Sequence, residues 1–150
     1  MKLSSSAFLN NELIPTKYTC DGKDISPHLF IEGIPADAKS LVLICDDPDA
    51  PMGTFVHWVM FNIPTNIAEI PEAIPAMNVL GNGSIQGNSD YKKIGYGGPC
   101  PPSGTHRYFF KLYALDTTLN LLPGVSKAQV EKAFDEHVIA KTELIGLYKR

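Results

Sequence analysis

The sequence predicts a mostly β protein with two packed sheets and one or two short helices, one of them late in the chain. Three apolar runs of strand length occupy residues 40–46, 55–63 and 106–115. The twelve glycines and twelve prolines favour many turns and few long helices. Strands separated by turns, followed by one helical pattern, are typical of sheets packed face to face.

The first third of the chain alternates strand candidates with turn chemistry. Residues 3–9 (LSSSAFL) form the first candidate strand. Residues 14–35 consist mainly of turn signals, among them an Asp-Gly and a Ser-Pro pair, with a short apolar strand at 29–31. Residues 40–46 then carry four consecutive apolar side chains, which predicts a buried strand.

The middle of the chain contains a strand, a long irregular segment and a second strand. Residues 55–63 are apolar on both faces apart from His57 and Asn62, which predicts a central strand. Residues 63–98 contain three spaced prolines, and such a long loop is usually functional or packed tightly on itself. Residues 106–115 are rich in aromatic side chains and predict another strand.

The helical pattern begins after Ser126, which is a candidate N-cap. Val130, Ala133, Phe134 and His137 fall on one face of the predicted helix. Residues 139–148 have mixed periodicity and are interpreted as a last strand. No internal repeat or linker divides the chain, so we expect one domain over residues 1–150.

Composition argues against several function classes. The net charge of −3 provides no basic field for nonspecific nucleic-acid binding. No apolar run approaches the roughly 20 residues of a transmembrane segment, and the N-terminus lacks the features of a secretory signal. The three cysteines have no metal-type spacing and are expected to be reduced thiols. We therefore expect a cytoplasmic protein without a metal site or a cofactor.

An acidic turn joins two of the predicted strands. Asp46, Asp47 and Asp49 lie within four residues, and Pro48 and Pro51 stiffen the turn. Turn carboxylates often accept hydrogen bonds from backbone amides two residues on. The alternative is that one of these carboxylates orients a histidine or a ligand, which would make the turn one wall of a site.

The second candidate wall is GYGGPCPPSGTHRY, residues 95–108. Its glycines allow close backbone approach to a ligand, and its prolines fix the loop before binding. His106 and Tyr108 point to the same strand face, whereas Arg107 points to the other and is expected to form a salt bridge with the acidic turn. His57 is either a buried structural residue or part of the same site.

Three chemistries fit these residues. Imidazoles, a tyrosine hydroxyl and loop amides can converge on phosphate oxygens. Two histidines with an aspartate could instead hold a metal ion, although no short ligand spacing supports this. Cys100 with His106 could form a nucleophilic pair, but no supporting signature accompanies it. His28 and His137 are interpreted as surface or capping residues.

Three motifs, DDPDAP, HWVMFNIP and GPCPPSGTHRYFFKLYALD, follow one another along the chain. Together they resemble the phosphatidylethanolamine-binding protein family, and most closely its bacterial Raf-kinase-inhibitor-like branch. KYTCDGKDISP and the terminal LIGLYKR are also similar to that branch. The resemblance implies a large antiparallel sheet packed on a smaller one, with a pocket at one end that binds anions, including the phosphate groups of phospholipids or phosphorylated partners.

Carried over motif by motif, the resemblance implies a set of pocket residues. The ligand-binding residues would be Asp47, His57, Gly98, Cys100, Pro101, Pro102, His106 and Tyr108. Asp49, Pro51 and Arg107 would support the pocket. The resemblance also implies a homodimer.

The chain departs from the branch at two positions. Ile31 stands where a tryptophan is common, and Glu136 precedes His137 where a glycine is common. The second departure puts in doubt a role for the C-terminal segment near the pocket mouth. The chain also lacks the extra C-terminal helical sequence of eukaryotic relatives, so kinase regulation is not assumed.

The sequence thus favours a non-enzymatic protein that binds a small anion or a phosphorylated ligand. The alternative is an inhibitor of a kinase or a protease that acts through a protein-interaction surface, such as the loop at residues 64–95. A hydrolase that uses the His-Asp pocket is the third class, and no activated nucleophile in the sequence supports it.

Overall fold

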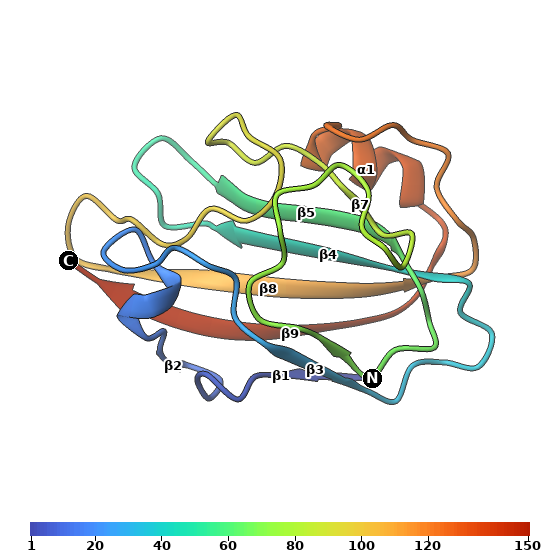
Figure 1. Cartoon of the computed structure of the whole chain (residues 1–150), viewed down its shortest axis with the longest axis horizontal. Coiled ribbons are helices and arrows are strands. Elements are labelled where there is room, and N and C mark those ends of the chain that lie inside the picture. Colours follow the sequence, from blue (N-terminus) through green and yellow to red (C-terminus); the bar gives the residue numbers. More distant parts are fainter.

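Two β-sheets pack face to face, as the sequence predicts (Figure 1). The computed structural model describes all residues, 1–150. The larger sheet has six strands in the order β2 (Glu12–Leu13), β9 (Val138–Lys149), β8 (Thr105–Leu115), β4 (Ser40–Asp47), β5 (Phe55–Ile63) and β7 (Ile85–Gln86). The smaller sheet has three strands in the order β1 (Lys2–Ser4), β3 (Leu29–Glu32) and β6 (Glu69–Ile70).

The strands of the large sheet are antiparallel, except that β2 runs parallel to β9. In the ladders, Asp47 is opposite Phe55, and Asp46 is opposite Phe109. The end of β4 therefore meets the beginnings of β5 and β8 at one end of the sheet. This register brings the acidic turn next to the segment that precedes β8.

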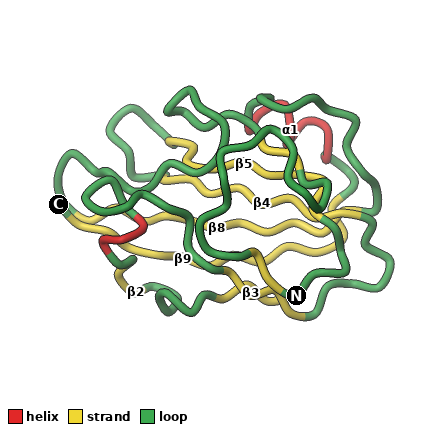
Figure 2. The backbone as a smooth tube through the Cα atoms, in the orientation of Figure 1, coloured by secondary structure: helices red, strands yellow, loops and turns green.

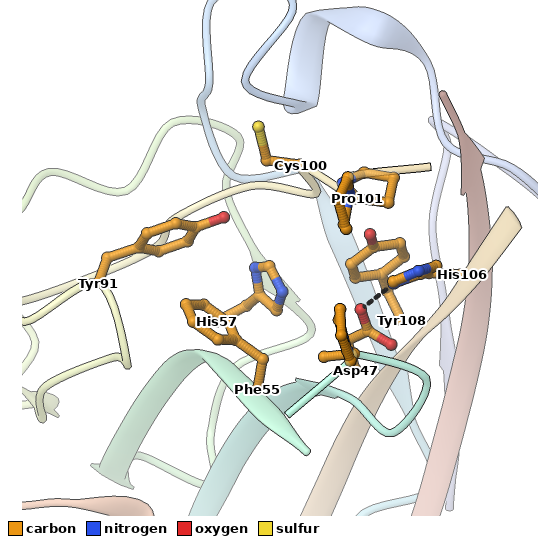
Figure 3. A pocket seen from close by; sticks show the side chains of 11 residues that line it. Asp47, Phe55, His57, Tyr91, Cys100, Pro101, His106 and Tyr108 are labelled. Carbon is orange, nitrogen blue, oxygen red and sulfur yellow. Dashed lines mark hydrogen bonds and ion pairs between the residues drawn. The ribbon is translucent and has the colours of Figure 1, made fainter. Parts of the chain in front are cut away.

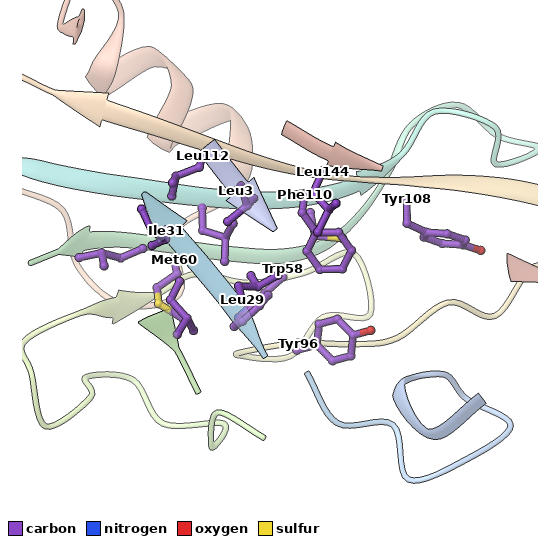
Figure 4. Close-up of a cluster of buried hydrophobic side chains, with 14 of the residues drawn as sticks. Leu3, Leu29, Ile31, Trp58, Met60, Tyr96, Tyr108, Phe110, Leu112 and Leu144 are labelled. Atoms are coloured by element: carbon purple, nitrogen blue, oxygen red, sulfur yellow. The ribbon is translucent and has the colours of Figure 1, made fainter. Parts of the chain in front are cut away.

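The two faces of the large sheet carry separate hydrophobic clusters. The cluster between the sheets includes Leu29, Trp58 and Phe110 (Figure 4). The cluster on the opposite face lies beneath helix α1 (Lys127–Phe134) and includes Phe61 and Phe134. Burial on both sides explains why β4 and β5 are apolar on both faces.

The position of β5 differs from the central one that its apolar faces suggested. Only the two-residue strand β7 lies between β5 and the edge of the sheet. The second face of β5 is buried by α1 and the segment before the helix, where Leu119 and Val125 pack against this cluster. Coverage by a helix thus produces the same apolar pattern as a central position in the sheet.

The long segment at residues 63–98 is mostly loop (Figure 2) and is held by side-chain hydrogen bonds. Gln86 is fully buried, accepts a hydrogen bond from the Trp58 indole and donates to the carbonyls of Pro75 and Met77. This buried amide fixes the loop to β5. The segment is therefore packed tightly on the domain, which is one of the two roles expected for it.

The cap of α1 and the last strand form as predicted, whereas the first strand ends earlier than predicted. Ser126 caps α1, because its hydroxyl accepts from the Gln129 amide while the Gln129 side chain accepts from the Ser126 amide. The last strand forms as expected. The first strand is shorter than residues 3–9, since the Ser5 hydroxyl bonds locally to the Ala7 amide and ends the extended chain.

The chain also contains a short 3-10 helix, η1 (Thr16–Tyr18). None of the helices combines the length and apolar character that crossing a bilayer requires.

Candidate functional site

A cavity of about 290 Å³ opens where β4 ends and where β5 and β8 begin (Figure 3). Its wall combines the acidic turn, the Gly-Pro loop before β8 and part of the long loop. The lining residues are Asp47, Ala50, Pro51, Phe55, His57, Tyr91, Cys100, Pro101, Pro102, His106 and Tyr108. The fold therefore brings together the two stretches that the sequence suggested as opposite walls.

Asp47 and His106 form a buried pair in this cavity. Oδ2 of Asp47 lies 2.6 Å from Nδ1 of His106, and both residues are buried. The other oxygen, Oδ1, accepts from the Asp49 amide at 2.7 Å. Asp47 thus serves both roles considered for it, as a turn-stabilising acceptor and as the group that orients a histidine. With Nδ1 directed at Asp47, Nε2 is the ring nitrogen of His106 that remains for a ligand.

His57 is buried beside the cavity and is neutral. Its Nδ1 lies 2.6 Å from the carbonyl oxygen of Gly97, and since a carbonyl only accepts, Nδ1 carries the proton. Burial lowers the pKa of His57 below its ordinary value of 6.5, and this outweighs the opposite effects of the Gly97 bond and nearby carboxylates. The remaining nitrogen, Nε2, is therefore a hydrogen-bond acceptor at neutral pH.

Aromatic rings hold the His57 imidazole in place. The rings of Phe55, Tyr91 and Tyr108 lie 5.0, 5.5 and 5.1 Å from it, centroid to centroid, and the two tyrosines meet it edge to face. Edge-to-face contacts of this kind are favourable for aromatic rings. The imidazole is thus fixed before any ligand enters.

The two tyrosines of the cavity differ in what their hydroxyls do. The Tyr91 hydroxyl donates to the Gly98 carbonyl at 2.8 Å, and burial raises the pKa of Tyr91 to about 12. The Tyr108 hydroxyl has no hydrogen-bond partner within the chain. Burial, followed by the charge of Asp47, raises the pKa of Tyr108 well above 10, so its hydroxyl remains a protonated donor.

Tyr91 and Phe55 were missed by the sequence reasoning. Tyr91 lies in an irregular segment with no strand periodicity, so nothing indicated which way its ring points. Its single weak signal was an aromatic residue in the polar run GNSDYKK. Phe55 was included in the predicted strand, but its place opposite Asp47 depends on the register of β4 and β5.

Arg107 forms the salt bridge that was expected of it. Its guanidinium donates twice to the Asp49 carboxylate, at 2.9 and 2.8 Å, and its amide donates to the same group at 3.0 Å. Neither Arg107 nor Asp49 lines the cavity, whereas Pro51 does. Arg107 and Asp49 therefore tie the acidic turn to β8 from outside.

Gly98 lies behind the wall rather than on the cavity surface. Its amide donates to Oδ1 of Asp24 at 2.7 Å, and its carbonyl holds Tyr91. A Cβ atom at this position would collide with the carbonyl oxygen of Tyr18 and with Asp24. Only glycine allows this close approach between the Gly-Pro loop and the segment after η1.

The expectation of reduced thiols is wrong for two of the three cysteines. Cys20 and Cys100 form a disulfide, while Cys45 is free and buried in the core. The partners are 80 residues apart, so only the fold reveals that their loops meet. The disulfide also removes the Cys100–His106 nucleophile. The cytoplasmic location stays a prediction that cysteine usage no longer supports.

No group of three or more His, Cys, Asp or Glu side chains is arranged to hold a metal ion. His28 and His137 lie outside the cavity and pair with Glu69 and Asp116. His137 is exposed as expected, whereas the His28 side chain is only 20% exposed and is thus largely buried against the small sheet.

The family model described as "Phosphatidylethanolamine-binding protein" matches residues 4–149. The chain belongs to the phosphatidylethanolamine-binding protein family. The UPF0098 protein of Methanothermobacter thermautotrophicus is 54% identical over 150 residues, which cover 100% of this chain and 99% of that protein. The UPF0098 protein PH1269 of Pyrococcus horikoshii is 58% identical over 150 residues, covering 97% of this chain and 75% of that protein.

Solved structures of the phosphatidylethanolamine-binding protein family share the fold. A homologue from Chlamydia trachomatis has a TM-score of 0.91 at 40% identity, covering 99% of this chain and 96% of that one. YbcL of E. coli, described as a member of the mammalian family, has a TM-score of 0.90 at 31% identity, covering 99% and 98%. These likenesses support the fold that the three motifs implied.

Proposed function

We propose that this protein is a non-enzymatic binding protein whose cavity takes a small anion of the phosphate class. The observation that carries the proposal is the convergence of His57, His106 and Tyr108 on one cavity, each with a polar atom that has no partner within the chain. The ligand would be inorganic phosphate, a phospholipid head group or another phosphorylated molecule, since all three present the same oxygens.

The charge of the cavity constrains how it would bind an anion. No lysine or arginine is among the lining residues, and Asp47 is their one carboxylate. A neutral His57 presents an acceptor, which repels a bare phosphate oxygen. A proton must therefore enter with the ligand, either on an imidazole or as a phosphate hydroxyl that donates to Nε2. Affinity is expected to fall as pH rises.

The same lining supports binding rather than turnover. It contains no serine or threonine, and its one cysteine is in a disulfide. The raised pKa values of Tyr91 and Tyr108 make both hydroxyls poor nucleophiles. The lining thus offers no activated side-chain nucleophile for a covalent intermediate.

The experiment is a phosphate titration followed by NMR of the histidine ring protons. We expect shifts in His57 and His106 but not in His28 or His137. Tyr108→Phe should weaken binding about tenfold or more, because a hydroxyl that donates to a charged oxygen is lost. Tyr113→Phe is the matched control, since Tyr113 is also buried but lies in the cluster beneath α1. Unshifted His57 and His106 signals at millimolar phosphate would refute the proposal.

Adding phosphoethanolamine and phosphoserine as separate ligands distinguishes the possible sources of the phosphate group. Tighter binding of one of them than of inorganic phosphate identifies contacts beyond the phosphate oxygens. Equal affinities mean that the cavity recognises the phosphate alone.

A further inference from the structure

The disulfide lies at the cavity wall and is accessible from solvent. Cys100 lines the cavity and is half-buried, whereas Cys20 is exposed in the segment after η1. In Figure 3 the sulfur of Cys100 points out of the cavity, and Pro101 follows it directly along the wall. A change at this bond is therefore transmitted to the lining residues Pro101 and Pro102.

A cation lies against both sulfur atoms. Nη1 of Arg150 is 3.2 Å from Sγ of Cys100 and 3.8 Å from Sγ of Cys20. A guanidinium favours a thiolate over a thiol, and a thiol with a lowered pKa is the better leaving group in disulfide exchange. Arg150 also pairs with Asp21, whose Oδ2 lies 3.5 Å from its Nε, and this carboxylate opposes part of the effect of the cation on either thiol. The closer of the two sulfur contacts indicates that Cys100 is the sulfur that leaves.

We propose that Cys20–Cys100 is a thiol-exchange site through which a small thiol controls the cavity. A thiolate such as that of glutathione attacks Sγ of Cys20, which is the exposed residue of the pair. The S–S bond breaks, and Cys100 leaves as a thiolate beside Arg150. A second thiolate then attacks the sulfur of the bound small thiol, which releases Cys20 as a thiolate and forms the oxidised small-molecule disulfide. Two small thiols are oxidised, and one protein disulfide is reduced.

Opening the bond weakens the cavity wall in two ways. The wall keeps its hydrogen bonds to the N-terminal segment, from Gly98 to Asp24 and from Cys20 to Pro99, but loses its covalent tie. The wall is then less ordered before binding, which lowers affinity. The Cys100 thiolate also adds a negative charge behind the cavity wall, which disfavours an anion in the cavity. This second step rests on the proposed function, whereas the exchange reaction does not.

The exchange reaction is tested by thiol chemistry. In Cys20→Ser, the rate of Cys100 alkylation by iodoacetamide against pH gives the Cys100 pKa, which we expect below the ordinary value of about 8.5. Adding Arg150→Ala should raise this pKa, and Arg150→Lys should restore part of the difference. Lys149→Ala is the matched control, since it removes a cation one residue away. A Cys100 pKa of 8.5 or above that is the same with and without Arg150→Ala overturns the proposal.

The rate of reduction by glutathione in the intact protein gives a second test. Arg150→Ala should slow it by roughly three- to tenfold, because the leaving thiolate loses its cation. Lys149→Ala should leave the rate unchanged. A disulfide that survives millimolar glutathione in the folded protein overturns the proposal, since the bond would then be purely structural.

Control of the cavity is measured with inorganic phosphate as the probe. Reduced wild type should bind at least about fivefold more weakly than oxidised wild type. The Cys20→Ser, Cys100→Ser double variant has the open wall without the thiolate. Its phosphate affinity should therefore lie between those of oxidised and reduced wild type, and glutathione should not change it. Equal affinities of the two wild-type forms overturn the control step.

Amide exchange separates this inference from the proposed function. If neither form binds phosphate, the proposed function fails, and hydrogen exchange of the Gly98 amide decides the inference. That amide donates to Asp24 in the segment that carries Cys20, so reduction should speed its exchange. Unchanged exchange on reduction would mean that the bond does not control the wall.

Discussion

Asp46 and Asp47 are consecutive residues of β4, yet their carboxylates lie on opposite faces of the large sheet. Asp46 pairs with Lys111 at 3.1 Å and with Lys127 of α1 at 2.7 Å. Asp47 faces the cavity and pairs with His106 at 2.6 Å. Alternation along a strand thus assigns one carboxylate to the helix and the other to the candidate site.

This separation predicts opposite effects of two similar substitutions. Asp46→Asn should lower the free energy of unfolding by about 2–4 kcal/mol, because it leaves two lysines around a buried neutral group. Its phosphate affinity should stay within twofold of wild type. Asp47→Asn should weaken phosphate binding about tenfold, since His106 loses the carboxylate that orients its ring and directs Nε2 into the cavity. Urea denaturation and calorimetric titration measure the two quantities, and a variant that lowers both equally would contradict this division of roles.

His57 predicts that stability and affinity respond to pH in opposite directions. Its pKa is lowered by burial, so the unfolded chain binds the proton more tightly than the folded one. The contribution of His57 to stability is complete above about pH 6.5 and declines as pH falls toward the lowered folded pKa. Phosphate affinity should rise over the same interval, because binding takes up a proton.

Urea denaturation between pH 5 and 8 tests the stability part on wild type and His57→Gln. The decline of stability between about pH 6.5 and 5 should be smaller in the variant. Equal slopes would show that His57 is not the group responsible. Phosphate titrations at the same pH values test the affinity part, and a flat affinity would contradict proton uptake.

Gly98→Ala should damage the wall behind Tyr91. The added methyl group meets the Tyr18 carbonyl and Asp24, so the Gly-Pro loop must shift, which costs about 1–3 kcal/mol of stability. Phosphate affinity should fall together with stability. Gly81→Ala is the control, since a Cβ atom there meets nothing within 4 Å. Wild-type behaviour of Gly98→Ala would mean that the close approach is not required.

Arg107→Gln distinguishes a supporting role from a ligand-binding one. Arg107 pairs with Asp49 outside the cavity, so phosphate affinity should change by less than about twofold, and stability should fall only slightly, as is usual for exposed ion pairs. A large loss of affinity with unchanged stability would instead make Arg107 a ligand-binding residue.

The homodimer stays a prediction that sedimentation of the wild-type protein tests.

Local patterns predicted the long strands and the cap of α1, but not the two-residue strands β2, β6 and β7, because the causes of the former lie within a few residues. The apolar runs that became β4 and β5, and the Ser126 cap, are examples of this. The salt bridge of Arg107 was also predictable, since strand alternation separates it from His106 and Tyr108. The resemblance to a known family then joined the two walls into one site.

The features that the sequence did not reveal depend on contacts between distant segments. Tyr91 reaches the cavity because the adjacent Asp90 exchanges hydrogen bonds with Val56 of β5, and Gln86 with Trp58 also holds the long loop there. The sequence could not show that β5 lies near an edge of the sheet, because burial beneath α1 makes its second face apolar. The Cys20–Cys100 pair depends on the close approach at Gly98, for which no short-range pattern exists.

The disulfide makes residues 20–100 a closed covalent ring, with β8, α1 and β9 on the tail that leaves it. The long loop at residues 63–98 lies inside this ring, so a protease that cuts the loop once opens the ring without releasing a fragment. The nicked protein should run as one species on a gel without reductant and as two with it. One cut anywhere in this long loop would therefore leave the molecule in a single covalent piece.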